Sequence, residues 1–255
     1  MPSPPTVVFV HGAWHTPECW TKVIPRLEAQ NYRCATVRLA STLGNPAATF
    51  GDDVAAVQAV IKEHTSQGRN VLVVGHSYGG AVSSTAIKGL TKPAGDNTET
   101  PGTGYVVGLM LITTTFIKTG SSFGACINGS QTETGGVSVD AANGWMVVDG
   151  NPRDIFYNDL SIEEAAEWGA KLQKQAIAVL VDETGYAGWK DVPVWFLAAK
   201  QDHIIAYESQ KQWCQAAIAE GANVKVLELD SSHSPFLSQP VETTNFIQGA
   251  ILALS

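Results

Sequence analysis

The segment NVLVVGHSYGGAV, residues 70–82, joins a run of β-branched residues to a helical pattern of small residues. Gly75, Ser77 and Gly79 within it form the pattern G-x-S-x-G. A sharp turn from a strand into a helix forces the serine into a strained backbone conformation, and glycine two positions before and after removes side-chain clashes. The turn also lifts the hydroxyl clear of the sheet edge, beside the N-terminal N–H groups of the helix. The segment therefore predicts a strand–turn–helix unit that presents Ser77 as a nucleophile.

A glycine-rich strand-to-helix connection without any catalytic role is the alternative, because G-x-S-x-G often occurs by chance. The context here is more specific than the bare pattern. A strand pattern precedes it, a helix pattern follows it, and Gly80 adds a further glycine. These features favour the catalytic interpretation of Ser77.

Short apolar runs alternate with helical patterns along the rest of the chain. The predicted strands are Thr6–Val10, Cys34–Leu39, Asn70–Gly75, Val106–Thr113, Val192–Ala198 and Val224–Leu229. The predicted helices are Cys19–Gln30, Gly51–Gln67, Ala81–Leu90, Ala206–Glu220 and Val241–Leu254. The strand runs are continuously apolar, which is typical of strands buried on both faces of a parallel sheet. The pattern predicts an α/β fold with a mostly parallel central sheet and helices on both faces.

One long stretch, from Thr113 to the strand at Val192, interrupts this alternation. A loop of that length without secondary structure is implausible in a compact domain. Ser161 and Glu164 form a capping box that begins a helix. Apolar residues follow at helical spacing, namely Ala165, Trp168, Leu172 and Val179. We therefore expect a small inserted helical cap over residues 116–190, with residues 1–115 and 191–255 forming the core.

The amino-acid composition and net charge of the chain exclude some classes of function. Hydrophobic residues make up 44% of the 255 residues and charged residues 16%, which is typical of a globular chain. The net charge of −8 argues against nucleic acid or an anionic membrane as partner. No apolar run of about 18 residues is present to span a bilayer, and no signal peptide is apparent. We expect a cytoplasmic protein acting on a small molecule, with the choice between monomer and homodimer left open.

The four cysteines, Cys19, Cys34, Cys126 and Cys214, are widely spaced and form no C-x-x-C pair or Cys/His cluster. A zinc site requires such a cluster, so we expect no metal and no cofactor. Buried free thiols are the preferred interpretation of these residues.

Six histidines are candidates for the base that a weakly nucleophilic serine hydroxyl needs. Position in the chain gives five of them other expected roles: His11, His15, His64, His76 and His203. His233 remains, in a Ser-Ser-His-Ser-Pro loop after the last strand, at the carboxyl end where open α/β sheets bind ligands. A lone loop histidine is usually just exposed, but the chain order serine, acid, histidine favours a catalytic role.

The acid that orients this histidine must lie between Ser77 and His233 in chain order. Asp202 follows a predicted strand and so lies at a carboxyl end. Asp230 is the rival because it is close to His233, although it ends a strand and would more naturally cap the turn. Asp191 precedes its strand and lies at the wrong end. Asp202 is the expected acid.

Two N–H donors must stabilise the oxyanion of a tetrahedral intermediate. The residue after the nucleophile, Tyr78, supplies one. The loop after the first strand should supply the other, and Gly12 lets the backbone turn there toward the site. We expect the Ala13 N–H to be the second donor, against the alternative of an ordinary glycine turn.

These segments together resemble the α/β-hydrolase superfamily. The resemblance rests on His11–His15, Gly75–Gly80, Lys200–Asp202 and Ser232–Pro235, and it is closest to the branch of plant methylesterases and hydroxynitrile lyases. It implies a triad of Ser77, Asp202 and His233 beneath a cap that sequesters a small or medium-sized apolar ester. Hydroxynitrile lyases of this branch carry a lysine after the histidine, where Ser234 stands here, which favours the hydrolytic side.

Aromatic residues near the expected site are candidates to bind substrate: Trp14, Phe116, Trp145 and Phe236. Core packing is the alternative for each of them. No arginine or lysine stands where it would obviously fix a substrate carboxylate, so a neutral apolar group is expected.

Three functions remain at this stage. The favoured one is hydrolysis of an apolar carboxylic ester or lactone by a serine nucleophile through an acyl-enzyme. A second keeps the triad for biosynthetic acyl transfer, cyclisation or carbon–carbon cleavage. A third, from a different class, is a ligand receptor on the same fold, against which an intact triad counts. Fold alone does not decide among them.

Overall fold

A computed structural model describes residues 3–93, 95, 102–128 and 135–254 of the chain. Of the predicted cap, residues 129–134 lie outside this description. None of the helices among the described residues is long and apolar enough to cross a membrane.

Six parallel strands form the central sheet, in the order β2-β1-β3-β4-β8-β9. Their bounds are β1 Thr6–Val10, β2 Cys34–Val37, β3 Val71–His76, β4 Val106–Ile112, β8 Val194–Ala199 and β9 Val224–Leu229. The inner strands β1, β3 and β8 are buried along their whole length. The α/β fold predicted from the sequence is confirmed.

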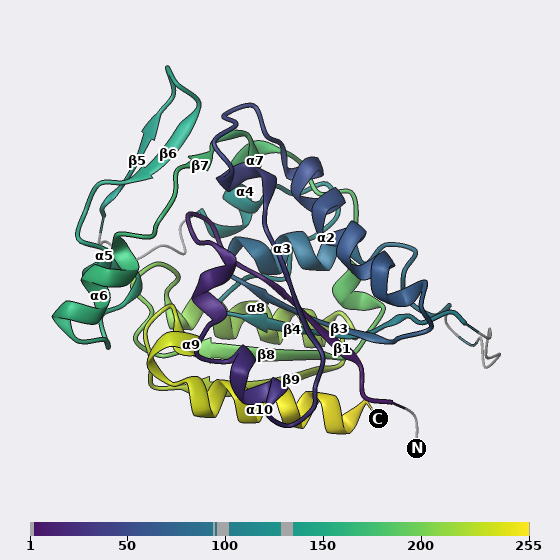
Figure 1. Cartoon of the computed structure of the whole chain (residues 1–255). Coiled ribbons are helices and arrows are strands. Elements are labelled where there is room, and N and C mark those ends of the chain that lie inside the picture. Colours follow the sequence, from purple (N-terminus) through teal and green to yellow (C-terminus); the bar gives the residue numbers. More distant parts are fainter. Residues whose placement is uncertain (1–2, 94, 96–101, 129–134, 255) are drawn as a thin grey trace.

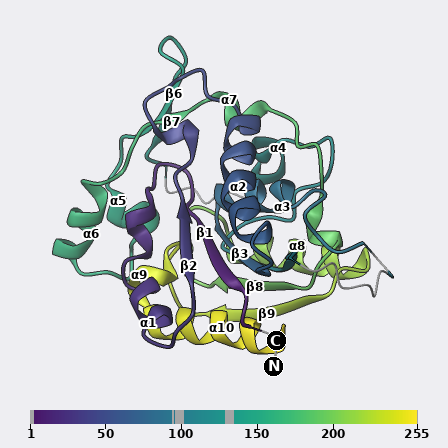
Figure 2. The ribbon, with the colours of Figure 1, turned by 45° about the vertical axis from the view of Figure 1, so that its right-hand side comes forward.

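Helices cover both faces of this sheet (Figures 1 and 2). On one face lie α2 (Phe50–Thr65), α3 (Tyr78–Ala86) and α8 (Tyr207–Ala219), and on the other α1 (Ile24–Glu28) and α10 (Pro240–Ala253). Successive residues of a strand point to opposite faces. Val8 and Val10 of β1 accordingly join the core under α2 and α3, whereas Val7 and Phe9 join the core under α1 and α10.

The helix expected over Cys19–Gln30 is wrong as a single element. The structure has a short 3₁₀-helix, η1 (Pro17–Trp20), and then α1. Pro25 stands in the first turn of α1. Because proline lacks an N–H and clashes within a helix, it favours the start of a new helix. Two more short elements belong to the core, η2 (Ala40–Thr42) and α9 (Pro235–Ser238), and a third, η3 (Gly188–Lys190), lies at the end of the 116–190 segment.

Residues 116–190 contain short helices and a small antiparallel sheet. The helices are α4 (Phe123–Ile127), α5 (Pro152–Phe156), α6 (Ile162–Gly169) and α7 (Ala178–Val181). The sheet has the order β5-β6-β7, with β5 Val137–Asp140, β6 Trp145–Val148 and β7 Gln175–Ala176. In Figure 1, β5, β6, α5 and α6 lie together at the left, away from the two chain termini.

The helix predicted to begin at Ser161 is α6. It begins where expected, because the Ser161 side chain accepts a hydrogen bond from Glu164 N. It ends at Gly169, so the prediction that Leu172 and Val179 continue the same helix is wrong. The chain leaves the helix there to pair β7 with β6, and Val179 belongs to α7. The helical spacing of the apolar residues therefore spans two separate helices, α6 and α7.

Candidate active site

Ser77 stands between β3 and α3 with backbone angles φ 51° and ψ −128°. A positive φ is strained for a residue with a side chain. Hydrogen bonds on both sides hold it there: Ser77 N donates to Ile112 O at 2.9 Å, and Ser77 O accepts from Thr114 Oγ1 at 2.6 Å. The sequence pattern thus forms the sharp strand-to-helix turn that presents a serine at the end of a central strand.

The close approach of two backbone segments explains why glycine stands at position 79, two residues after Ser77. A Cβ on Gly79 would lie 2.2 Å from His11 O and 2.8 Å from Val10 O. The first turn of α3 therefore packs directly against the end of β1. No larger residue fits at this position without separating the two elements.

His233 and Asp202 form a buried hydrogen-bonded pair. His233 Nδ1–H donates to Asp202 Oδ2 at 2.7 Å, and the two residues are 1% and 4% exposed. Donation from Nδ1 leaves Nε2 with its lone pair, which is the tautomer that a general base requires. The sequence-predicted acid and base are brought together.

The Asp202 carboxylate has a full set of donors. Its Oδ1 accepts from Ile204 N at 2.8 Å and Ile205 N at 2.9 Å, and its Oδ2 also accepts from Gln210 Nε2 at 3.0 Å. Charge-assisted hydrogen bonds of this kind stabilise a buried carboxylate and fix its orientation. The rival Asp230 instead accepts from Gln201 Nε2 at 2.8 Å in an exposed loop.

His76 connects the serine turn to the histidine loop. Its Nε2–H donates to the His233 carbonyl at 3.0 Å, and the two imidazole rings lie 4.7 Å apart. Thr113 Oγ1 donates to the same carbonyl at 3.0 Å. Local sequence does not indicate this role, because the carbonyl that His76 binds is remote in the chain. Among the described residues Ser77 Oγ forms no hydrogen bond, and the neighbouring Thr114 and His233 side chains bind Ser77 O and Asp202.

The loop after β1 passes directly beside Ser77. A Cβ on Gly12 would lie 3.0 Å from Ser77 Cβ and 2.7 Å from His76 Nδ1. Ala13 and Tyr78 follow on either side of this approach, and both line the same cavity as Ser77. Neither of their amides donates to an acceptor within the described residues. The sequence predicts these two N–H groups as the donors to an oxyanion.

Two buried histidines hold this loop and are neutral. His11 Nδ1 donates to Gly12 O at 2.9 Å, and its Nε2 accepts from Leu39 N at 3.3 Å. His15 Nδ1 donates to Ala13 O at 2.7 Å. Burial lowers the pKa of His11 to about 4 and that of His15 to about 3. Both ring nitrogens of each histidine are engaged in hydrogen bonds, so the two side chains act as fixed partners of this loop and have no free lone pair to accept a proton from Ser77.

Their neutrality predicts an acid-labile fold. In the folded chain the pKa of each histidine is below the ordinary 6.5, so protonation favours the unfolded chain. The contribution of the two neutral side chains to the free energy of unfolding is therefore complete above about pH 6.5 and is lost as the pH falls toward 4. Each histidine should contribute a slope of up to about 1.4 kcal/mol per pH unit in that window. Urea denaturation at pH 7 and pH 5 should show a clearly lower midpoint at pH 5. Equal midpoints would contradict the buried, neutral state of the two side chains.

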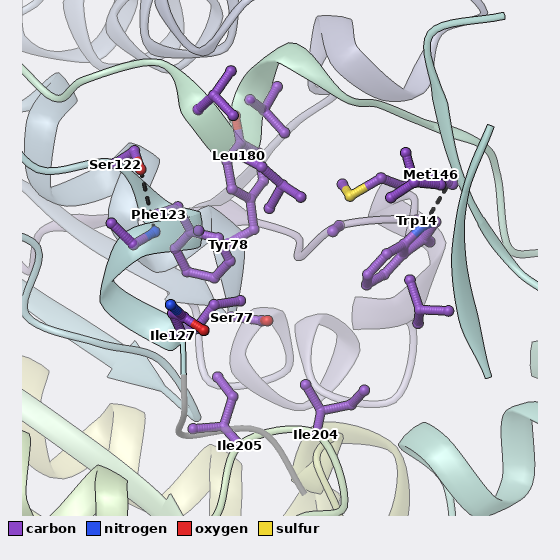
Figure 3. Close-up of a pocket in the computed structure, with 18 residues that line it drawn as sticks. Trp14, Ser77, Tyr78, Ser122, Phe123, Ile127, Met146, Leu180, Ile204 and Ile205 are labelled. Atoms are coloured by element: carbon purple, nitrogen blue, oxygen red, sulfur yellow. Dashed lines mark hydrogen bonds between the residues drawn. The ribbon is translucent and has the colours of Figure 1, made fainter. Parts of the chain in front are cut away.

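A cavity of about 520 Å³ opens over Ser77 (Figure 3). Ala13, Ser77 and Tyr78 of the core meet side chains of the 116–190 segment, including Phe123, Met146 and Leu180. Ile204 and Ile205, which follow Asp202 in the chain, line the cavity at the bottom of Figure 3, across from Leu180. Its polar side chains are Ser77, Tyr78, Ser122 and Asn128, and no charged residue is among those that line it in the described structure. The cavity suits an uncharged, largely apolar ligand.

Of the four aromatic residues expected to bind substrate, only Trp14 lines this cavity. Phe116 stacks on Phe196 in the core, with ring centroids 5.4 Å apart. Phe236 is fully buried against Trp20 and His76. Trp145 packs with Ala48 and Ala176 at the base of the small sheet. These three predictions are wrong because apolar burial, not proximity to a catalytic loop, decides where such rings lie.

A buried carboxylate fixes the Tyr78 ring in the cavity wall. Tyr78 OH donates to Asp53 Oδ2 at 2.7 Å, and Ser41 N donates to the other carboxylate oxygen at 3.0 Å. Burial raises the pKa of Asp53. Asp53 carries no motif, and only the fold brings it under the nucleophile turn.

Comparison with known proteins gives the family. A family model described as "Alpha/beta hydrolase family" matches residues 7–245. The chain belongs to this family. It is 27% identical over 250 residues to "Alpha/beta hydrolase nvfD" of Aspergillus novofumigatus, covering 96% of both chains. This α/β hydrolase and that relative therefore align over almost their whole lengths, and a hydrolase is the general function that the family supports.

Solved structures of the same fold include esterases. A pyrethroid hydrolase from Sphingobium faniae JZ-2 superposes with a TM-score of 0.75 at 20% identity, covering 98% of each chain. A methylesterase from Arabidopsis superposes with a TM-score of 0.72 at 18% identity, covering 98% of this chain and 100% of the other. The family model confirms the predicted resemblance to α/β hydrolases, and the fold is also that of a plant methylesterase. Within the described residues of the α/β hydrolase, no three His, Cys, Asp or Glu side chains are grouped as a metal site requires.

Proposed function

We propose that this α/β hydrolase is a serine carboxylester hydrolase that cleaves neutral, apolar esters or lactones through an acyl-enzyme. The observation that carries the proposal is the buried Asp202–His233 pair beside the strained turn of Ser77. The apolar cavity opens directly over that serine. A strained serine turn close to a buried histidine–carboxylate pair supports this proposal, because serine hydrolases on unrelated folds use these three groups as nucleophile, base and orienting acid.

In the first half of the reaction, His233 Nε2 takes the Ser77 hydroxyl proton as Oγ attacks the ester carbonyl. The carbonyl oxygen becomes an oxyanion, which the Ala13 and Tyr78 amides stabilise. His233 then gives its proton to the leaving alcohol oxygen as the C–O bond breaks. In the second half a water molecule loses a proton to His233 Nε2 as it attacks the acyl carbon. His233 then returns that proton to Ser77 Oγ as the bond between Oγ and the acyl carbon breaks, which releases the acid and restores the serine hydroxyl.

The uncharged lining of the cavity defines the substrate class. An ionised carboxylate placed against Phe123, Met146 and Leu180 would lose its hydration without gaining a partner. Transfer of an unpaired ion to such a site costs several kcal/mol. We therefore expect rejection of esters that carry a negative charge on the acyl group.

A matched pair of substrates tests both parts of the proposal. The neutral ester p-nitrophenyl hexanoate should be hydrolysed, with one molecule of water added to the acyl product by mass. The mono-p-nitrophenyl ester of adipic acid, of the same chain length but ending in a carboxylate, should have a kcat/KM lower by about 100-fold or more. Comparable kcat/KM values would contradict the substrate class. An acyl product without added water would contradict hydrolysis itself.

A further inference from the structure

We propose that residues 154–159, here called the bracing segment, form a positioning element that holds all three catalytic loops in register. The inference rests on the proposed function, and it assigns a role to the sequence Asp-Ile-Phe-Tyr-Asn-Asp that no motif in the chain suggests. The bracing segment runs from the end of α5 into the turn before α6. It makes a separate hydrogen bond or pair of bonds to the loop after β1 (residues 11–16, the oxyanion loop), the loop after β8 (residues 200–206, the acid loop) and the loop after β9 (residues 230–234, the base loop).

Tyr157 braces the oxyanion loop. Its hydroxyl lies 2.9 Å from His15 Nε2, and His15 Nδ1 is 2.7 Å from the Ala13 carbonyl. A carbonyl can only accept, so His15 donates from Nδ1 and accepts the Tyr157 hydroxyl proton at Nε2. Tyr157 is fully buried. The two hydrogen bonds therefore connect Tyr157, through His15, to Ala13, whose amide is a proposed oxyanion donor.

Asp159 braces the base loop. Its Oδ2 accepts from Ser232 N at 2.8 Å. This amide belongs to the residue immediately before His233. A carboxylate acceptor gives a stronger and better oriented bond than a neutral group would. The bond fixes the direction in which the chain enters His233.

The acid loop is held on both sides of Asp202. Asn158 Nδ2 donates to Gln201 O at 3.1 Å. On the other side, His203 Nδ1 donates to Asp154 O at 2.8 Å. The two neighbours of the acid are therefore both tied to the bracing segment.

Phe156 fills the space between these loops. Its ring centroid lies 5.7 Å from that of Trp14, 5.5 Å from that of His15 and 6.0 Å from that of His233. The side chain is 1% exposed. Catalytic groups must be held within about 0.5 Å of their working positions by packed and hydrogen-bonded neighbours. A single segment that touches three strand-end loops meets that requirement.

The bracing segment does not touch the substrate cavity. The cavity is lined by other parts of the described chain, and none of residues 154–159 is among them. A positioning residue that never contacts substrate should change kcat and leave KM alone. A residue of the cavity wall, such as Leu180, should change KM.

The kinetic test uses Tyr157→Phe, Asp159→Ala and Asp159→Asn in the full chain. Loss of one buried hydrogen bond should lower kcat for p-nitrophenyl hexanoate by about 10-fold or more in Tyr157→Phe and Asp159→Ala, with KM unchanged within about 2-fold. Asp159→Asn keeps an oxygen that can accept from Ser232 N and should recover most of the loss. Tyr186→Phe removes a hydroxyl that binds Asp191 outside these loops, so kcat should stay at the wild-type value. Leu180→Ala should raise KM.

A second readout does not depend on turnover. The proton between His233 Nδ1 and Asp202 gives a low-field resonance in the nuclear magnetic resonance spectrum when the pair is buried and ordered. Asp159→Ala should broaden this resonance by faster exchange with water, and Asp159→Asn should restore it. If the wild type hydrolysed no ester yet the resonance behaved in this way, the proposed function would fail and the bracing role would stand.

The bracing role is overturned if Tyr157→Phe and Asp159→Ala keep both the wild-type kcat and the wild-type resonance. It is also overturned if their whole effect is on KM, because that would place them in substrate binding. Should Asp159→Ala fold poorly, Asp159→Asn and Tyr157→Phe decide the matter, since both are close in shape to the native residues.

Discussion

Replacing Ser77 by alanine is expected to lower kcat for a neutral p-nitrophenyl ester by about 10⁵-fold or more. The side chain lines the cavity, and the proposed acyl-enzyme cannot form without its hydroxyl. The strained turn itself should survive, because its hydrogen bonds use the backbone N and O of residue 77. The variant should therefore fold and bind ester while failing to turn it over. Stopped assays with purified protein measure the residual rate.

Ser83→Ala is the matched control for this prediction. Ser83 lies on α3, the helix that follows Ser77, is fully buried, and donates from its hydroxyl to Gly79 O at 2.6 Å. Its loss should lower the free energy of unfolding by about 1 kcal/mol and keep kcat near the wild-type value. Turnover by Ser77→Ala at a rate close to that of Ser83→Ala would rule out Ser77 as the nucleophile.

Replacing Asp202 by asparagine should lower kcat by about 10⁴-fold. The Ile204 and Ile205 amides select the oxygen of the asparagine side chain for the Oδ1 position. The NH₂ group must then face His233 Nδ1 and donate to it. The imidazole proton moves to Nε2, where the lone pair of the general base is needed. The NH₂ group would also meet Gln210 Nε2, another donor, so some loss of stability is expected as well.

Asp230→Asn tests the rival acid under the same chemistry. An asparagine at this position can still accept from Gln201 Nε2, so kcat should remain close to that of the wild type. A large loss in Asp230→Asn together with normal activity in Asp202→Asn would reverse the assignment of the acid.

The core of the fold was predictable because its strands are buried on both faces. A strand such as β1 carries the uninterrupted run Thr6–Val10, and the predicted and observed bounds coincide. The 116–190 segment was harder to predict. Trp145–Val148 forms β6 between β5, its neighbour in a hairpin, and β7, which is remote in sequence, and a pairing with a remote strand leaves no local periodicity. The same limit explains why one helix was expected where α6 and α7 are separate.

Some residues of the candidate site could be predicted from local sequence and others could not. Ser77, Asp202 and His233 could be singled out because each follows a strand at the carboxyl edge, in a chain order that the chemistry requires. The walls of the cavity could not, because Phe123 and Leu180 lie on short helices that reach the site only through the fold. Tyr157 and Asp159 carried no signal either, since their partners His15 and Ser232 are remote in sequence.

The central claim is that Ser77 is the nucleophile, and covalent labelling tests it most directly. The protein is treated with a fluorophosphonate, digested with trypsin, and the peptide of residues 70–88 is fragmented in a mass spectrometer to locate the adduct among its serines. If Ser77 is the nucleophile, the protein carries one adduct, on Ser77, that is retained in Ser83→Ala and absent in Ser77→Ala. Absence of labelling in the wild type, or an adduct that persists in Ser77→Ala, would contradict it.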